Sequence, residues 1–516
     1  MENGRVVSSA GELAMVVIDG ASLTLEQVEE VARKGAQVAL APEARERMAR
    51  RRQGIEERLA AGEVIYGVNT GFGRMADVVI PPQRLRELQL NLLRSHACGV
   101  GPPFASEVVR AMLLLRANVL ATGFAGVRPE VVERLLELLN AGVHPVVPSQ
   151  GSVGASGDLA PLAHLALVLV GEGYAQVGDA VLPGREALAR AGLTPLTLAP
   201  KEGLALINGT QAMTAVGALA LLDGERLCQA ADVVAAMSVD ALEGTDVAFL
   251  EEIHRARPHP GQMASARNLF GLLQGSEIRE SHRRCSRVQD AYALRCTPQV
   301  HGAAREALAH LRGKLAIEVN SATDNPMVLE DGRVVSGGNF HGAAVAAAFD
   351  YATIALTDVA SISERRAARL VTPEQSGLPA FLVPDPGLHS GFMMAHVTAA
   401  ALVSECKTLA HPASVDSIPT SAGREDHVSM GTWAARKLAT VVEHLRYVLA
   451  IELLLAAQGI ELRRPLRSSP ALERALGRLR QDVPFLAEDR FLHADILKAA
   501  ALVPHLDPGR LLAAPS

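Results

Sequence analysis

Long stretches with apolar residues at helical spacing constrain the fold of this chain most. Five such runs, each longer than an average helix, occur after residue 203. They cover residues 204–235, 303–319, 343–362, 391–409 and 431–457. Helices of this length are stabilised by burying their apolar faces against one another. The pattern therefore predicts a mainly α fold with a long central helical bundle.

The composition favours close packing of these helices. Of the 516 residues, 49% are hydrophobic but only 3% are aromatic. Small side chains let helix backbones approach closely, and the length is sufficient to bury a large core. We predict a smaller N-terminal lobe, residues 1–203, that carries active-site loops. Residues 204–516 then form the long-helix bundle and C-terminal helices, with the boundary in the Pro- and Gly-containing stretch 196–203.

The N-terminal lobe alternates between helical patterns and glycine-rich loops. Helices are predicted within residues 23–61, 83–93, 109–121, 129–139 and 159–170, and a short hairpin near residues 175–182. Residues 66–74, YGVNTGFGR, contain three glycines and break every periodic pattern, so they form a loop. Residues 143–158, rich in Pro, Gly and Ser, form a second loop that leads into a buried helix.

Charge and cysteine usage indicate a cytoplasmic protein. Lys and Arg number 50 against 56 Asp and Glu, a net charge of -6, so nucleic acid is not an expected partner. The cysteines are scattered without CxxC spacing and are predicted to be reduced thiols. They are Cys98, Cys228, Cys285, Cys296 and Cys406. The first residues lack the features of a signal peptide, and the apolar run 342–361 contains Asp350 and Asp358, which predicts a buried core helix and no membrane partner.

Residues 151–158, GSVGASGD, permit unusual chemistry. In isolation such a cluster of small residues is a turn. The same small residues also allow a severe bend, in which the amide nitrogen of Gly157 attacks the carbonyl carbon of Ala155 and closes a five-membered ring. Loss of water from Ser156 then leaves an exocyclic methylidene, which is a strong electrophile. Glycine suits the nucleophilic position because it has no Cβ to clash.

The segment GSVGASGDLAPLAH resembles a motif, GxxxASGDLAPLxH, of the aromatic amino acid ammonia-lyase and aminomutase family. Further family motifs follow in family order along almost the whole chain. They are YGVNTGFG, INGTQ, QDAYALRCTPQVHG, TDNP, GGNFHG, SERR and EDHVSMG. The resemblance implies a 4-methylidene-imidazol-5-one cofactor that forms autocatalytically from Ala155, Ser156 and Gly157, without an external cofactor or a metal.

The resemblance also implies roles for residues that bind or deprotonate the substrate. Tyr66 is the general base for a β-proton, which requires nearby positive charge or hydrogen bonds because a phenol ordinarily titrates near about 10. Arg295 clamps the substrate carboxylate bidentately. Asn208, otherwise a helix cap, orients that carboxylate and the ring oxygen of the electrophile.

The same resemblance places three further residues in the substrate-binding pocket. Gln289 and Tyr292 line it, although an ordinary polar wall is an equal alternative for both. Phe340, otherwise a core residue, shields the electrophile from water.

Two positions bear on the substrate. Ser95-His96 is the pair that histidine enzymes of the family carry, and Glu425 begins the Glu-Asp-His of those enzymes. His96 and Glu425 are predicted to hydrogen-bond the imidazole nitrogens, and Glu425 also handles protons on the amino group. The alternative is a buried histidine with a satisfied partner and a glutamate in a core network. Ala343 departs from the pattern, because many histidine enzymes have an acidic residue there.

These residues predict a carbon–nitrogen lyase that eliminates ammonia from L-histidine to give trans-urocanate. A tyrosine 2,3-aminomutase, or a tyrosine or phenylalanine ammonia-lyase with the same electrophile, is the alternative. The resemblance further implies a homotetramer with shared active sites.

Other classes of protein fit less well. A non-catalytic helical scaffold would use residues 155–157 only as a tight turn. A fumarase-type lyase would carry the motif GSSxMPxKxN, which the sequence lacks. A metal hydrolase is not supported, because His254 and His259 lack clear ligand spacing with an acidic partner.

Overall fold

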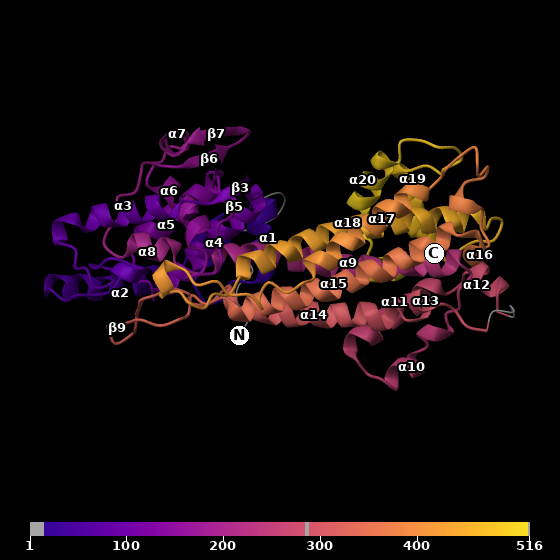
Figure 1. The fold of residues 1–516 in the computed structure, drawn as a ribbon, viewed down its shortest axis with the longest axis horizontal. Coiled ribbons are helices and arrows are strands. Elements are labelled where there is room, and N and C mark those ends of the chain that lie inside the picture. Colours follow the sequence, from indigo (N-terminus) through magenta and orange to yellow (C-terminus); the bar gives the residue numbers. More distant parts are fainter. Residues whose placement is uncertain (1–14, 284–287, 514–516) are drawn as a thin grey trace. The chain divides into compact units, whose positions relative to one another are not determined.

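The computed structural model describes residues 15–283 and 288–513, so the predicted free thiol of Cys285 lies outside the described residues. Within these ranges the chain forms 21 α-helices and nine strands of two to four residues (Figure 1). The prediction of a mainly α fold is confirmed.

The described chain packs as two compact units, each assembled from separate stretches of sequence. The first unit contains residues 15–219, 312–349 and 413–436, and the second contains residues 220–283, 288–311, 350–412 and 437–513. The predicted division of the sequence at residue 203 stays a prediction.

The first unit combines helices with short paired strands. Its helices are α1 (Leu25–Lys34), α2 (Pro42–Ala60), η1 (Gly73–Met75), η2 (Pro82–Arg84), α3 (Leu85–His96), α4 (Ser106–Ala121), α5 (Pro129–Asn140), α6 (Leu159–Leu169), α7 (Gly184–Arg190), α8 (Glu202–Ile207) and η5 (Ser421–Gly423). Its strands are β1 (Val16–Ile18), β2 (Val38–Leu40), β3 (Val100–Pro103), β4 (Val143–Pro145), β5 (Pro148–Gln150), β6 (Tyr174–Val177), β7 (Ala180–Pro183), β8 (Met327–Val328) and β9 (Val334–Val335).

The strands pair in four small sheets. β1 pairs in parallel with β2, with Val16 opposite Val38, and the sequence pattern had not predicted this pair. β3 pairs with β5, and β8 with β9, both antiparallel. β4, β6 and β7 form a three-stranded antiparallel sheet, in which β6 and β7 are the predicted hairpin.

Local sequence explains where several helices begin and end. Thr24 caps α1 by accepting a hydrogen bond from the Gln27 amide, while the Gln27 side chain accepts from the Thr24 amide. Gly35 ends the same helix with φ 72°, a left-handed conformation that costs glycine little. Pro129 occupies the first turn of α5, where its missing amide proton costs no helical hydrogen bond.

Four long helices contain residues of both units. They are α9 (Gln211–Ala241), α14 (Thr297–Glu318), α15 (Ala343–Val371) and α18 (Gly431–Leu462). Their small residues permit close contact, as predicted: an ideal Cβ added at Gly217 of α9 would lie 2.0 Å from the ring of Phe349 in α15. In the second unit, an ideal Cβ at Gly224 of α9 would lie 3.4 Å from both Leu308 and Leu356.

The second unit holds the remaining helices. They are η3 (Val247–Phe249), α10 (Glu251–Arg255), α11 (Pro260–Leu273), α12 (Glu277–Ser281), α13 (Tyr292–Arg295), α16 (Pro373–Ser376), η4 (Ala380–Leu382), α17 (Met393–Leu409), α19 (Pro470–Asp482), α20 (Leu492–Leu502), η6 (Val503–His505) and α21 (Pro508–Ala513).

The helix α15 is long and apolar enough to cross a membrane by length and composition alone, but 61% of its apolar window is buried inside the protein. It also carries buried charges with partners. Asp350 lies 3.0 Å from Lys437, and Arg366 pairs with Glu452. The prediction of a core helix is confirmed, and the helix continues beyond the predicted end to Val371.

One predicted helix, residues 204–235, is wrong as a single element. α8 ends at Ile207 and α9 begins at Gln211, so Asn208, Gly209 and Thr210 interrupt the helix. Apolar residues resume at Ala212 and Met213, so the overall pattern of the run predicts one helix although residues 208–211 are not apolar. Gly209 has φ 148°, and its amide and carbonyl bond to another loop instead of to a helix.

Candidate active site

The tripeptide Ala155–Ser156–Gly157 lies in a sharply bent loop between β5 and α6. Positive φ angles occur at Gly154 (83°), Ser156 (49°) and Gly157 (79°). For Ser156 this is a conformation that non-glycine residues rarely adopt. An ideal Cβ at Gly157 would lie 2.1 Å from the Gly209 carbonyl oxygen, so only glycine fits. The severe bend predicted from the small residues is therefore present.

The interruption between α8 and α9 braces this loop. The Asp158 amide donates to the Gly209 carbonyl oxygen at 2.7 Å, and the Gly209 amide donates to the Ser156 carbonyl oxygen at 3.3 Å. Gly209 thus holds the two peptide groups that flank Gly157. The hydrogen bonds explain why the helix stops at Asn208.

Asp158 anchors the loop from inside the first unit. Its fully buried carboxylate accepts hydrogen bonds from the Met213 amide at 2.8 Å, from Ser152 Oγ at 3.1 Å and from the Thr432 hydroxyl. Burial raises the pKa of Asp158, and these hydrogen bonds act in the opposite direction.

Glu425 reaches the tripeptide from a distant part of the sequence. Ser156 Oγ donates to Glu425 Oε1 at 3.2 Å. The other carboxylate oxygen accepts from Thr420 Oγ1 at 3.0 Å and from Ser421 Oγ at 2.5 Å. The residue predicted to select the substrate therefore contacts the residue predicted to supply the alkene.

His96 occupies the last turn of α3. Its Nδ1 lies 2.9 Å from the Leu92 carbonyl oxygen, which can only accept, so Nδ1 carries the proton and Nε2 is an acceptor. Burial lowers the pKa of His96, while the Leu92 carbonyl and the charge of Glu425 partly oppose that shift. The imidazole is therefore neutral at pH 7.

Tyr66 lies half-buried in the predicted glycine-rich loop, which is confirmed as a loop. Its hydroxyl oxygen accepts a hydrogen bond from the Gly73 amide at 3.5 Å. An ideal Cβ at Gly73 would lie 3.9 Å from Ser421 Cβ. Because Ser421 donates to Glu425, the loop of Tyr66 meets the loop that holds Glu425.

Asn208 and Phe340 lie in the same unit. Asn208 is 3% exposed, and its Nδ2 donates to the Asn325 carbonyl oxygen at 3.2 Å, whereas its Oδ1 has no hydrogen-bond partner among the described residues. Phe340 is half-buried two residues before Gly342. An ideal Cβ at Gly342, the last residue of GGNFHG, would lie 3.2 Å from Ser429 Oγ, and one at Gly154 in the tripeptide loop would lie 2.2 Å from the same atom. The GGNFHG segment and the tripeptide loop therefore both pack against the Ser429 side chain.

The other three predicted residues, Gln289, Tyr292 and Arg295, belong to the second unit. Tyr292 and Arg295 are the two ends of α13. The Arg295 guanidinium lies 4.5 Å from the centre of the Tyr292 ring, and Arg295 Nε donates to the Asp290 carbonyl oxygen at 3.0 Å. Gln289 and Tyr292 are exposed, Tyr292 at 71%.

A buried ion pair in the second unit supports α13. Arg366, the last residue of the SERR motif, donates to both carboxylate oxygens of Glu452, from Nε at 2.5 Å and from Nη2 at 3.0 Å. Both side chains are fully buried, and the Ser238 and Ser363 hydroxyls also donate to Glu452. Arg366 Nη1 donates to the Ala293 carbonyl oxygen of α13 at 3.4 Å.

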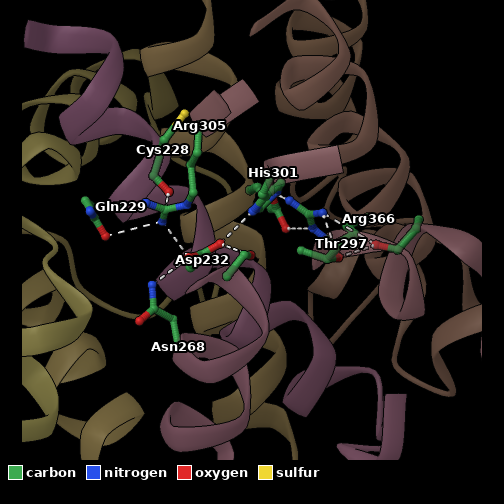
Figure 2. A network of polar contacts seen from close by, with 11 residues as sticks. Cys228, Gln229, Asp232, Asn268, Thr297, His301, Arg305 and Arg366 are labelled. Carbon is green, nitrogen blue, oxygen red and sulfur yellow. Dashed lines mark hydrogen bonds and ion pairs between the residues drawn. The ribbon is translucent and has the colours of Figure 1, made fainter. Parts of the chain in front are cut away.

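A second buried cluster lies beside this pair (Figure 2). His301 Nδ1 lies 2.8 Å from Asp232, and Arg305 Nη2 lies 2.6 Å from the same carboxylate. Burial opposes ionisation of Asp232, but the charge of Arg305 and the His301 contact outweigh it and lower the pKa of Asp232 to about 2. The carboxylate is ionised at neutral pH and fixes α14 against α9.

The residues at the tripeptide fit the predicted methylidene-imidazolone. Gly157 has no room for a side chain, Ser156 bears the hydroxyl that would leave as water, and Asn208 presents an unpaired amide oxygen nearby. In the part of the chain that the structure describes, no cluster of three or more His, Cys, Asp or Glu side chains is arranged to hold a metal ion. The four described cysteines form no disulfide.

Several residues that position this site were not predicted. Asp158 directly follows the tripeptide, and a carboxylate at the start of an apolar helix was a usable signal. Gly209 was visible only as part of the INGTQ motif. Thr420 and Ser421 carried no recognisable signal, because their importance depends on contacts with Glu425.

The chain is similar to known proteins over nearly its full length. Residues 23–481 match the family model "Aromatic amino acid lyase". A histidine ammonia-lyase of Anaeromyxobacter sp. (strain K) is 57% identical over 498 residues, covering 95% of this chain and 98% of the relative.

Solved structures agree. The histidine ammonia-lyase of Trypanosoma cruzi is 46% identical with a TM-score of 0.90, covering 97% of this chain and 95% of that one. The tyrosine aminomutase of Streptomyces globisporus is 40% identical with a TM-score of 0.91, covering 97% and 98%. This chain belongs to the aromatic amino acid lyase family.

Proposed function

We propose that this enzyme eliminates ammonia from L-histidine to give trans-urocanate. The observation that carries the proposal is the hydrogen bond from Ser156 Oγ to Glu425 Oε1 at 3.2 Å. It joins the residue that would supply the alkene to a carboxylate typical of the histidine enzymes. The 57% identity to a histidine ammonia-lyase, against 40% to a tyrosine aminomutase, supports the same substrate.

The cofactor of the proposal is the methylidene-imidazolone formed from Ala155, Ser156 and Gly157, which supplies an electrophilic carbon for the substrate amine. The chain's own residues bind and orient the amino acid. His96 Nε2, an acceptor, takes a hydrogen bond from an imidazole N–H of the substrate, and Glu425 contacts the other end of that ring. Arg295 holds the carboxylate, with its guanidinium oriented by Tyr292 and Asp290.

Proton transfer falls to two further groups. Tyr66 removes the β-proton of the substrate and is held within its loop by the Gly73 amide. Glu425, which the Thr420 and Ser421 hydroxyls still hold after Ser156 has lost its own, takes up or returns protons of the amino group. Phe340 excludes water from the reacting centre.

A substrate panel tests the proposal. The purified protein is incubated separately with L-histidine, L-tyrosine and L-phenylalanine, and both ammonia and the conjugated acrylate are followed. We expect ammonia and urocanate in equal amounts from L-histidine and no turnover by a Ser156→Ala variant that retains the wild-type melting temperature. Formation of a β-amino acid from L-tyrosine without ammonia would favour the aminomutase instead.

We further propose that the active form is a homotetramer whose sites combine residues of different subunits. Exposed apolar side chains on two long helices support it. They are Tyr351 (49%) and Ile354 (46%) of α15, and Met394 (61%) and Val397 (46%) of α17. Light scattering should give four chains per particle, and an active monomer would contradict the proposal.

The proposed location is the cytoplasm. The absence of disulfides among the four described cysteines is consistent with a reducing compartment. Fractionation of the source cells with an antibody to the protein tests it, and recovery in a secreted or membrane fraction would contradict it.

A further inference from the structure

A buried arginine contacts the peptide segment that supports the tripeptide loop, and it forms no ion pair with a carboxylate among the described residues. Arg116 of α4 is fully buried. Its Nη1 donates to the Asn208 carbonyl oxygen at 2.8 Å, while Nε and Nη2 have no hydrogen-bond partner among the described residues. Asp324, one of the two nearby carboxylates, is already paired with Lys201 at 2.6 Å. Such a charge is costly to bury, so its retention calls for a role.

The hydrogen bonds lead from this charge to the reacting peptide. The Asn208 carbonyl and the Gly209 amide belong to one peptide unit, and that amide donates to the Ser156 carbonyl oxygen at 3.3 Å. A donor on one end of a peptide group polarises the group and strengthens the donor at its other end. The Ser156 carbonyl is in turn conjugated with the Gly157 nitrogen, the nucleophile of ring closure.

Arg116 also shapes the backbone through which it acts. An ideal Cβ at Gly209 would lie 3.0 Å from Arg116 Nη1, 2.4 Å from Gln211 Oε1 and 2.7 Å from Thr323 Oγ1. These groups leave no room for a side chain at Gly209. Burial lowers the pKa of Arg116 to about 10, so the guanidinium keeps its charge at neutral pH.

We infer that Arg116 is a positioning residue for formation of the electrophile: its charge acts through the Asn208–Gly209 peptide on the Ser156 carbonyl and promotes attack by the Gly157 nitrogen. The inference rests on the proposed function, because it requires that the ring forms.

The chemistry balances without another reactant. Attack forms a bond between the Gly157 nitrogen and the Ala155 carbonyl carbon. The first water carries away the Ala155 oxygen with the amide hydrogens of Gly157 and Ser156. The second carries away Ser156 Oγ with its own hydrogen and the Ser156 Cα hydrogen. As the Gly157 nitrogen loses its proton, negative charge gathers on the Ser156 carbonyl oxygen, where the polarised Gly209 amide stabilises it.

Intact-mass spectrometry of the purified full chain tests the inference independently of turnover. The readout is the fraction of chains that have lost two waters, measured at intervals after synthesis. We expect Arg116→Met to form the ring at least about 10-fold more slowly than the wild type, the scale set by losing one charge-assisted hydrogen bond. Arg116→Lys, which retains the charge, should restore part of the rate.

Arg52 provides a matched control in the same unit. It is 6% exposed and donates to the Pro200 and Gly126 carbonyl oxygens, with no bond to the tripeptide or to residues 208–209. Arg52→Met should lose stability yet form the ring at the wild-type rate. Equal ring formation in Arg116→Met and wild type, or an equal defect in Arg52→Met at the same melting temperature, would overturn the inference.

Two outcomes separate this inference from the proposed function. A wild-type chain that never loses two waters would refute the electrophile itself, whereas a normal wild type with an unaffected Arg116→Met refutes only the role of Arg116. If Arg116→Met does not fold, Arg116→Gln and Arg116→Lys replace it. The lysine variant must then form the ring faster than the glutamine variant, and equal rates would overturn the inference.

Discussion

Glu425 accepts hydrogen bonds from three hydroxyl groups, those of Ser156, Thr420 and Ser421. Hydroxyl donors stabilise an ionised carboxylate and fix its orientation, which suits a group that must meet the substrate in one geometry. His96, which is close enough to be influenced by the charge of Glu425, is held by the Leu92 carbonyl. At the scale of single residues, Thr420, Ser421 and Leu92 thus hold Glu425 and His96 in place without taking part in the proposed chemistry.

Glu425→Gln is the sharpest test of this arrangement. The amide preserves size but cannot take up a proton, so kcat/KM for L-histidine should fall about 100-fold or more, the size typical of losing a group that transfers protons. Steady-state kinetics measure the change.

Glu330→Gln is the control, because the side chain of Glu330 is 89% exposed in the same unit. Its kinetics should match the wild type. Unchanged kinetics in Glu425→Gln would remove Glu425 from the site.

At the scale of elements, the interruption between α8 and α9 matters most. Three residues leave the helix, and Gly209 uses its freed amide and carbonyl to hold Ser156 and Asp158. A continuous helix would have satisfied both groups internally and left the tripeptide loop unsupported. The break therefore supports the tripeptide loop, and Arg116 donates to the carbonyl oxygen of Asn208 within it.

Gly209→Ala should disturb this element. The added Cβ would lie 2.4 Å from Gln211 Oε1, and φ 148° is unfavourable for alanine, so we expect a loss of about 1–3 kcal/mol in stability and slower ring formation. Thermal melting and intact mass measure the two effects.

Gly142→Ala separates crowding from backbone strain. Gly142 also has a positive φ, 68°, but nothing lies within 4 Å of its ideal Cβ. This variant should lose some stability and form the ring normally. Equal ring formation in both variants would show that the geometry of Gly209 is unimportant.

The sequence predicted those helices and loops that depend on the residues within them. Apolar periodicity located the long helices, and glycine content located the loop of Tyr66. It missed the break at residues 208–210, because apolar runs precede and follow residues 208–211 and the backbone contacts at the break are made with Ser156 and Asp158. It also missed the contacts of Thr420 and Ser421, since Glu425 and Ser156 meet across 269 residues of sequence. The resemblance to family motifs identified the candidate residues, whereas only the structure shows which other residues contact them.

At the scale of the whole molecule, the predicted residues divide between two compact units. The first holds the tripeptide together with Tyr66, His96, Asn208, Phe340 and Glu425, and the second holds Gln289, Tyr292 and Arg295. Both units bury charged side chains, Arg116 in the first and the Arg366–Glu452 pair in the second. The ionisation of buried groups therefore affects the stability of the molecule.

Asp240 shows in which direction a change of pH alters the stability of the protein. It is buried in the second unit, where it accepts from the hydroxyls of Ser276 and Ser468, and burial raises its pKa to about 6. In the unfolded chain an aspartate carboxyl has a pKa of about 3.9. Its contribution to stability is therefore complete below that pH and is lost as the pH rises through about 6.

Asp240→Asn should abolish this loss. The difference in melting temperature, variant minus wild type, should therefore be larger at pH 8 than at pH 5. The corresponding difference in the free energy of unfolding should change by about 1 kcal/mol between the two pH values. Melting curves of both proteins at the two pH values measure it. A relative stability that is the same at both values would contradict the raised pKa.

The intact mass of the purified, active enzyme tests the electrophile itself. The account predicts that each wild-type chain weighs two waters less than its sequence requires, and that Ser156→Ala, which lacks the hydroxyl needed for the second loss, does not reach that mass. An active wild-type chain with the full mass of its sequence would contradict it.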